Sequence, residues 1–145
     1  MAIFNTAFEN GYGTVIATLT AYGVIAGGII GISENPLIAC AIGTTVMAGV
    51  TGSGSGGMTI ALTTIGSKLI EMANARGLSP DILHRISVVA CGGLDSLPHN
   101  GAVITLLGIC EMRHKDGYPD IGICTVVIPL FATFLCVVLG SLGVC

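Results

Sequence analysis

The most unusual polar segment of the chain is a run of seven small residues: Thr51-Gly52-Ser53-Gly54-Ser55-Gly56-Gly57. Glycine lets backbone N–H groups converge on an anion, and the hydroxyls of Ser53 and Ser55 are further donors. A helical pattern resumes at Met58, and the positive end of that helix would point at the run. This combination suits a carboxylate ligand. The alternative is a glycine-rich seam at which two helices pack.

The residues next to this run exclude two other interpretations of it. The spacing of Gly52 and Gly57 matches that of a phosphate-binding loop, but Met58 stands where such a loop needs lysine. A nucleophilic serine paired with His99 would need a strand-to-helix elbow, and the flanking sequence is helical and apolar. Nucleotide binding and hydrolase chemistry are therefore not expected, and the sequence predicts no enzyme.

A second polar segment lies inside an apolar stretch further along the chain: Asp95-Ser96-Leu97-Pro98-His99-Asn100-Gly101. Ionisable side chains within apolar sequence are costly and typically mark an ion or proton pathway. Burial disfavours the charged form of a carboxyl group, as proton coupling requires. Asp95 and His99 are therefore the candidate proton carriers. The alternative is a surface loop between two short helices.

The remaining ionisable residues are weaker candidates. Glu9 and Glu34 flank an apolar stretch and are interpreted as ordinary boundary charges. His84 and His114 lie among charged residues and are expected to be solvated. Three scattered histidines do not predict a metal site, and no cofactor is expected.

The overall composition requires an apolar environment. Of 145 residues, 52% are hydrophobic and only 9% are charged, whereas soluble domains carry about 25% charged residues. The mean hydropathy is +0.92. The net charge of −3 and the absence of a basic patch argue against nucleic acid as a partner. The lipid bilayer is the expected surrounding.

Charged residues divide the chain into spans and interrupted segments, which predict an all-α polytopic membrane protein in one domain, residues 1–145. Two full transmembrane helices are expected at about 12–32 and 121–145, the second with a possible kink at Pro129. Two interrupted elements are expected at about 36–75 and 82–110. Pro36 suits a first helical turn, and Ser79 with Pro80 suits a helix start. Residues 111–120 are predicted to be a hydrophilic loop.

Interrupted apolar segments are informative about function. Irregular backbone at membrane depth survives only where protein or a watery cavity surrounds it, and paired Gly/Pro interruptions indicate a transporter binding site. The two interruptions could meet in space. Two basic residues flank each end of the second element, which leaves open whether it turns back as a re-entrant loop or crosses the membrane as a broken helix.

Two longer motifs resemble the C-terminal half of the gluconate:proton symporter (GntP) family. The first is Ala48-Gly49-Val50-Thr51-Gly52-Ser53-Gly54-Ser55-Gly56-Gly57-Met58-Thr59-Ile60-Ala61-Leu62. The second is Gly92-Gly93-Leu94-Asp95-Ser96-Leu97-Pro98-His99-Asn100-Gly101-Ala102-Val103-Ile104-Thr105-Leu106-Leu107. The resemblance spans nearly the whole chain and is greatest to the branch of D-β-hydroxybutyrate permeases.

This resemblance implies a multi-pass carrier of the cell (inner) membrane. Such a carrier moves gluconate or short hydroxy acids such as 3-hydroxybutyrate by symport, usually with H⁺ and conceivably with Na⁺. The resemblance also implies an ion-transporter-superfamily repeat, in which residues 51–57 form the tip of a re-entrant hairpin and residues 95–101 the centre of a broken helix. It favours the crossing path for the second element.

The candidate binding residues follow from the polar segments together with the resemblance: Thr51, Gly52, Ser53, Gly54, Ser55, Gly56, Gly57, Ser96, His99 and Asn100. Ser53, Ser55 and nearby amides would hold the carboxylate, Asn100 and Thr51 would bind hydroxyls, and Asp95 or His99 would carry the proton. Full family members contain two such repeats, and this chain supplies the second. The missing N-terminal half or a second copy is therefore the expected partner; the alternative is a fragment or accessory subunit without transport of its own.

Overall fold

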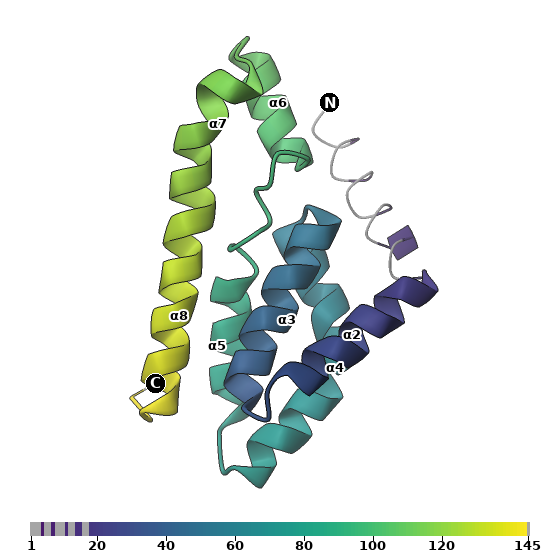
Figure 1. Cartoon of the computed structure of the whole chain (residues 1–145), viewed down its shortest axis with the longest axis vertical. Helices are drawn as coiled ribbons and strands as arrows, with labels where there is room; N and C mark the ends of the chain where they lie inside the picture. The colour runs from purple at the N-terminus through teal and green to yellow at the C-terminus, as the bar shows by residue number, and fades with distance from the viewer. Residues whose placement is uncertain (1–3, 5–6, 8–10, 12–13, 16–17, 145) are drawn as a thin grey trace.

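The computed structural model describes residues 4, 7, 11, 14–15 and 18–144, and all of its regular structure in that part of the chain is helical. This confirms the all-α prediction. The helices are α2 (Thr20–Ile32), α3 (Pro36–Thr51), α4 (Gly54–Ala75), α5 (Pro80–Ala90), α6 (Gly101–Ile109), α7 (His114–Gly122), the π-helical turn η1 (Ile123–Val127) and α8 (Ile128–Ser141). They form two interrupted elements, α3–α4 and α5–α6, and one long continuous helix, α7–η1–α8 (Figure 1).

The first interrupted element is an antiparallel hairpin that forms the centre of the fold. α4 presents a residue to the core at every fourth position: Gly57, Ala61, Ile65, Leu69 and Ala73. This spacing places them on one face of the helix, against α3 and α5. α2 lies across α3 and α4, and α8 packs on α5 and α3 (Figure 1). The hydrophobic core therefore lies among α3, α4 and α5.

Two helix starts follow from local sequence signals. The Asn35 side chain accepts a hydrogen bond from the N–H of Leu37, and Pro36 occupies the first turn of α3. Ser79 accepts from the N–H of Asp81, and Pro80 opens α5 in the same way. A polar cap followed by proline satisfies free N–H groups and presets the backbone. Both predicted starts are confirmed.

The C-terminal helix is the element best suited to cross a membrane. It runs without interruption from His114 to Ser141, 28 residues, and only 6% of its most apolar window is buried inside the protein. At 1.5 Å per residue it is about 42 Å long, enough to span hydrocarbon. Its outer surface carries apolar side chains, including Phe131, Phe134 and Leu135.

The boundaries of this helix differ from the predicted ones. The prediction of a loop at residues 111–120 is wrong from His114 onward, because polar residues continue the helix, supported by an ion pair of 2.9 Å between Arg113 and Asp116. The irregularity expected at Pro129 lies just before it, where the N–H of Ile128 donates to Ile123 O in a π-helical turn. Proline lacks an N–H and its ring clashes with the preceding turn, so widening that turn accommodates it.

The first predicted span, residues 12–32, is described only in part. Its C-terminal portion is α2, while residues 12–13 and 16–17, like Glu9, lie outside the described residues. Glu34 follows α2, and one of its carboxylate oxygens lies 4.0 Å from the guanidinium of Arg76 at the end of α4. Both side chains are largely exposed, so this ion pair contributes little to stability.

Candidate functional site

The first break consists of two residues, not seven. α3 ends at Thr51 and α4 begins at Gly54, so only Gly52 and Ser53 are non-helical. Gly52 has a φ of +63°, in the left-handed region that glycine adopts at little cost. Ser53 then caps α4, and its side chain accepts a hydrogen bond from the N–H of Gly56. One left-handed residue and one cap are enough to reverse the chain.

The prediction that the helix resumes at Met58 is therefore wrong by one turn. Gly54, Ser55, Gly56 and Gly57 are helical because the cap at Ser53 and the packing of α4 on α3 outweigh their low propensity. A Cβ on Gly57 would lie 2.3 Å from the Cα of Ala48. Gly57 thus allows the two backbones to touch, which is the packing role that the sequence left open.

The second break, residues 91–100, is longer and is not helical. It leaves α5 beside the long helix, where a Cβ on Gly93 would lie 2.8 Å from a methyl carbon of Leu130. It then runs to α6 as an irregular segment of turns and bends (Figure 1). The Asn100 side chain ends the break by accepting hydrogen bonds from the N–H groups of Ala102 and Val103, at 2.6 and 3.0 Å. Both predicted interruptions therefore exist.

The two breaks meet at the tip of the α3–α4 hairpin. The Asn100 side-chain amide donates to Gly52 O at 2.8 Å and to Asp95 O at 2.7 Å. His99 Nε2 lies 3.1 Å from Gly49 O and, because a carbonyl only accepts, it must carry the hydrogen. The bonds to Gly52 and Gly49 join residues 48 and 50 positions apart in the sequence. The hypothesis that the breaks lie together is confirmed.

Three glycines of the hairpin make this approach possible. A Cβ on Gly49 would lie 2.9 Å from Leu94 Cβ, and a Cβ on Gly52 would lie 3.0 Å from His99 Cδ2. A Cβ on Gly54 would lie 2.8 Å from Asp95 Oδ2. Each glycine thus admits one residue of the other break, and a larger side chain would separate the two segments.

The Asp95 carboxylate lies at the first residue of α4. One oxygen, Oδ2, faces Gly54, and the other, Oδ1, accepts a hydrogen bond of 2.8 Å from Ser96 Oγ. The first N–H groups of a helix have no partner within the helix, and its dipole is positive at that end. The positive, N-terminal end of α4 is therefore faced by the protein's own acid.

The predicted hydroxyl donors differ in accessibility. Thr51 Oγ1 is buried and donates to backbone carbonyls, that of Met47 being nearest at 2.8 Å. Ser53 is buried and accepts the capping bond, while Ser55 is exposed on the next position of α4. Ser96 is half-buried and bound to Asp95. Ser55 and His99 are thus the exposed polar side chains among the predicted binding residues.

Asn100 has a different environment from the one expected of a ligand for substrate hydroxyls. It is only 7% exposed, and both its amide hydrogens and its oxygen are used within the protein. These contacts make it a clasp between the two breaks. His84 on α5 and His114 at the start of α7 are exposed, and the His114 ring also binds Pro98 O.

Four residues of this site were not identified from the sequence: Gly49, Leu94, His114 and Tyr118. Gly49 and Leu94 contact one another only because the breaks meet, so neither has a local signal. Tyr118 donates a hydrogen bond to Ser96 O at 3.1 Å across 22 residues. Its position four residues after His114 would have indicated a shared face, had residues 114–122 been recognised as a helix.

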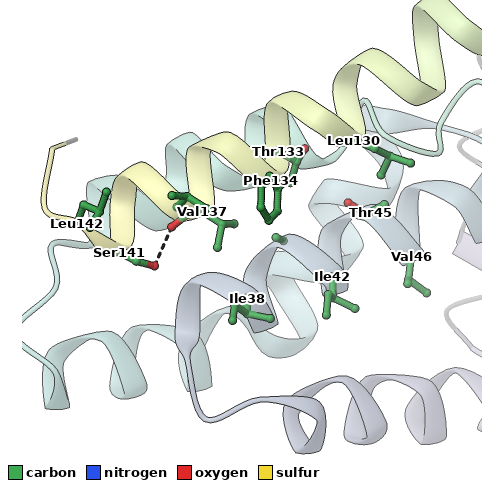
Figure 2. A pocket seen from close by; sticks show the side chains of 12 residues that line it. Ile38, Ile42, Thr45, Val46, Leu130, Thr133, Phe134, Val137, Ser141 and Leu142 are labelled. Atoms are coloured by element: carbon green, nitrogen blue, oxygen red, sulfur yellow. Dashed lines mark hydrogen bonds between the residues drawn. The ribbon is translucent and has the colours of Figure 1, made fainter.

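A groove of about 620 Å³ lies between α3 and α8, and no predicted binding residue lines it (Figure 2). Its lining is apolar apart from three hydroxyl residues, Thr45, Thr133 and Ser141. Each of these hydroxyls donates to a backbone carbonyl: that of Ala90, Pro129 or Val137, respectively. No charged residue lines the groove. It suits hydrocarbon and offers nothing to hold a carboxylate, so the tip is the candidate functional site.

Comparison with known proteins finds similarity to part of a longer bacterial protein. The chain is 41% identical over 127 residues to a protein of Bacillus subtilis (strain 168) that is named an uncharacterized transporter, YxjC. The match covers 88% of this chain and 27% of that relative, so the chain spans about a quarter of the relative's length. No family model and no solved structure matches the chain. The long apolar helix is in keeping with a membrane environment for this chain.

Proposed function

We propose that this chain forms the anion-binding part of a secondary carrier for gluconate or short hydroxy acids such as 3-hydroxybutyrate, coupled to protons. The observation that carries the proposal is the meeting of two helix breaks, with Asp95 beside Gly54 at the start of α4 and His99 against the end of α3. Such convergence of interrupted helices is typical of transporter binding sites. The resemblance of both motifs to the GntP family and the transporter-named relative support the same class.

The position of Asp95 suggests how a proton and an anion could be coupled. A substrate carboxylate drawn to the N-terminus of α4 would come close to the Asp95 carboxylate beside Gly54. Two like charges about 4 Å apart repel strongly when water is excluded. Protonation of Asp95 removes that repulsion, so the site would accept the anion and the proton together. This is the property that a symporter requires.

His99 is the second candidate for the proton. Because its Nε2 donates to Gly49 O, the neutral ring has Nδ1 as its acceptor. Uptake of a proton at Nδ1 would add a positive charge at the tip, which would attract a carboxylate. The ring is exposed, so a proton or substrate can reach it. Asp95 and His99 would thus act in the same direction on anion binding.

The outward face of α4 is a suitable polar approach to the tip. Ser55, Thr59, Thr63 and Ser67 lie at every fourth position and are exposed, opposite the face that packs in the core. The exposed face of α8 carries apolar side chains instead. We therefore assign α8 to the lipid and the hydroxyl face of α4 to water or to the remainder of the carrier.

The proposed membrane arrangement follows from these assignments. α3 and α4 form a re-entrant hairpin, α5 and α6 form a broken helix that crosses, and α2 and the long C-terminal helix belong to full spans of a multi-pass inner-membrane protein. The tip is open on the side of Ser55 and His99. That side is where the rest of a longer carrier, or a second copy of this chain, would complete the substrate shell.

Uptake into proteoliposomes tests the proposal. Vesicles containing only this chain are supplied with labelled gluconate or labelled D-3-hydroxybutyrate, with and without an inward proton gradient and, separately, a sodium gradient. Accumulation driven by the proton gradient is expected, and accumulation driven only by sodium would transfer the coupling to Na⁺. If folded, inserted protein gives no uptake, the chain does not transport these acids by itself, and the accessory or partial-carrier alternative holds.

A further inference from the structure

One turn of α7 contacts the second break at two backbone carbonyls. The hydroxyl of Tyr118 donates to Ser96 O at 3.1 Å, and Nε2 of His114 lies 3.1 Å from Pro98 O. As in the case of His99, the carbonyl can only accept, so Nε2 of His114 donates. The two side chains are four residues apart and lie on one face of the helix. Both side chains thus hold backbone carbonyls of the irregular second break.

A close contact at Gly117, which lies between His114 and Tyr118 in the sequence, strengthens the packing of α7. Gly117 is buried, and a Cβ there would lie 2.7 Å from Leu107 Cδ2 and 3.1 Å from Met112 Cε. The absence of a side chain lets α7 approach α6 and the connection that follows it. His114 and Tyr118 are therefore brought against the break by packing of the whole turn and not by long, freely rotating side chains.

The carbonyls that α7 holds are adjacent to the two candidate proton carriers. Ser96 follows Asp95, and Pro98 precedes His99. The backbone of this segment is not helical. Among the carbonyls of residues 94–99, only that of Leu97 accepts a hydrogen bond from a backbone N–H, which belongs to Asn100. A segment without a helical hydrogen-bond ladder depends on outside partners for its position.

We propose that Tyr118 and His114 are positioning residues, which hold the Ser96–Pro98 backbone so that Asp95 and His99 keep their places at the tip of the α3–α4 hairpin. The assignment of a transport consequence rests on the proposed function, whereas the positioning itself does not. Because α7 continues through η1 into α8, His114 and Tyr118 also connect the tip directly to the long apolar helix. Neither residue contacts the proposed anion position, so neither is a binding residue.

Hydrogen–deuterium exchange of the chain in lipid vesicles tests the positioning without any substrate. Tyr118→Phe removes one hydroxyl and His114→Ala one ring donor, and each should raise the exchange rate of peptides that cover residues 92–100 about fivefold, the factor that one neutral hydrogen bond is typically worth. Thr125→Val is the matched control, because its hydroxyl donates within the same long helix, to Ile121 O. It should leave this segment unchanged.

A substitution that restores a donor separates positioning from general packing. His114→Gln keeps an N–H donor at the end of the side chain and should return exchange of residues 92–100 toward the parent value, whereas His114→Ala should not. Unchanged exchange in Tyr118→Phe and His114→Ala, or equal effects of Thr125→Val, would overturn the inference.

The transport assay then distinguishes this inference from the proposed function. If the parent chain accumulates labelled D-3-hydroxybutyrate, Tyr118→Phe should lower proton-driven uptake about fivefold while counterflow exchange at saturating substrate falls less. Equal losses in both would contradict positioning of the proton carriers. If the parent shows no uptake but exchange responds as expected, the positioning by Tyr118 and His114 is established and transport by this chain alone is rejected.

Discussion

The two breaks of this chain differ in length and in what determines their shape. The first is two residues long, and its geometry comes from a left-handed glycine and a serine cap. The second has ten residues between α5 and α6 and depends on side chains from elsewhere, including Tyr118 and His114. Asn100 joins them. The comparison indicates that the first break is a rigid platform and that the second is a segment whose position can be adjusted.

The largest expected loss of stability comes from a change at the first break, where α3 packs against α4. Gly57→Ala places a Cβ within 2.3 Å of Ala48 Cα, so α3 and α4 must separate. We expect a loss of at least about 3 kcal/mol of stability, measured by denaturant titration in mild detergent with circular dichroism. Gly66→Ala on the same helix is the control, because its Cβ would meet only Leu62 Cβ at 3.8 Å. It should be neutral or slightly stabilising.

Removal of the clasp should have the next largest effect. Asn100→Ala removes the cap of α6 together with the bonds to Gly52 O and Asp95 O. We expect a loss of about 2–4 kcal/mol, since two carbonyls and a helix start lose their partner. Asn35→Ala removes a cap alone and should cost about 1 kcal/mol. Equal losses for the two variants would show that the breaks do not depend on one another.

The contact of Gly52 with His99 can be isolated with a pair of matched glycines. Gly52 and Gly77 have φ values of +63° and +67°, but a Cβ on Gly77 would meet nothing within 4 Å. Gly77→Ala should therefore cost only the conformational penalty, about 1 kcal/mol. Gly52→Ala should cost about 1–2 kcal/mol more, because the His99 ring must move. A difference near zero in the same unfolding assay would mean that the ring is not held against Gly52.

The adjustable break carries the candidate proton groups, so a change there should alter coupling more than stability. Asp95→Asn keeps the shape of the side chain and removes its charge. We expect substrate exchange to continue and the dependence of uptake on the proton gradient to disappear, measured with labelled substrate in proteoliposomes. Asp120→Asn, at an exposed position on α7, should leave both unchanged. Intact gradient dependence in Asp95→Asn would reject Asp95 as the proton carrier.

The smallest effect on stability is expected for two serines at the first break, Ser53 and Ser55. Ser53→Ala removes the cap of α4 and should cost about 1 kcal/mol, whereas Ser55→Ala affects an exposed hydroxyl and should cost less than about 0.5 kcal/mol. Ser55→Ala should nevertheless weaken uptake at low substrate concentration. If uptake by Ser55→Ala is unchanged, the Ser55 hydroxyl does not contact the anion.

Local signals predicted which helices and breaks exist better than they predicted where each one begins and ends. Proline at the first turn and a polar cap located the starts of α3 and α5, and long runs without charge located the interrupted segments and the last helix. The glycine run was assigned to one long break because propensity alone disfavours Gly54–Gly57 as helix. Packing against Ala48 reversed that preference, and no local pattern reports such a contact.

The sequence by itself determined that this chain is helical and apolar, where its two helix breaks lie, and which polar residues they contain. Those features depend on composition, caps and spacing, which act within a few residues. Only the tertiary structure decided that Asn100 clasps the hairpin, that Asp95 faces the start of α4, and that Tyr118 and His114 support the second break. These contacts join residues 16 to 48 positions apart, so they arise from the packing of helices and not from local preference.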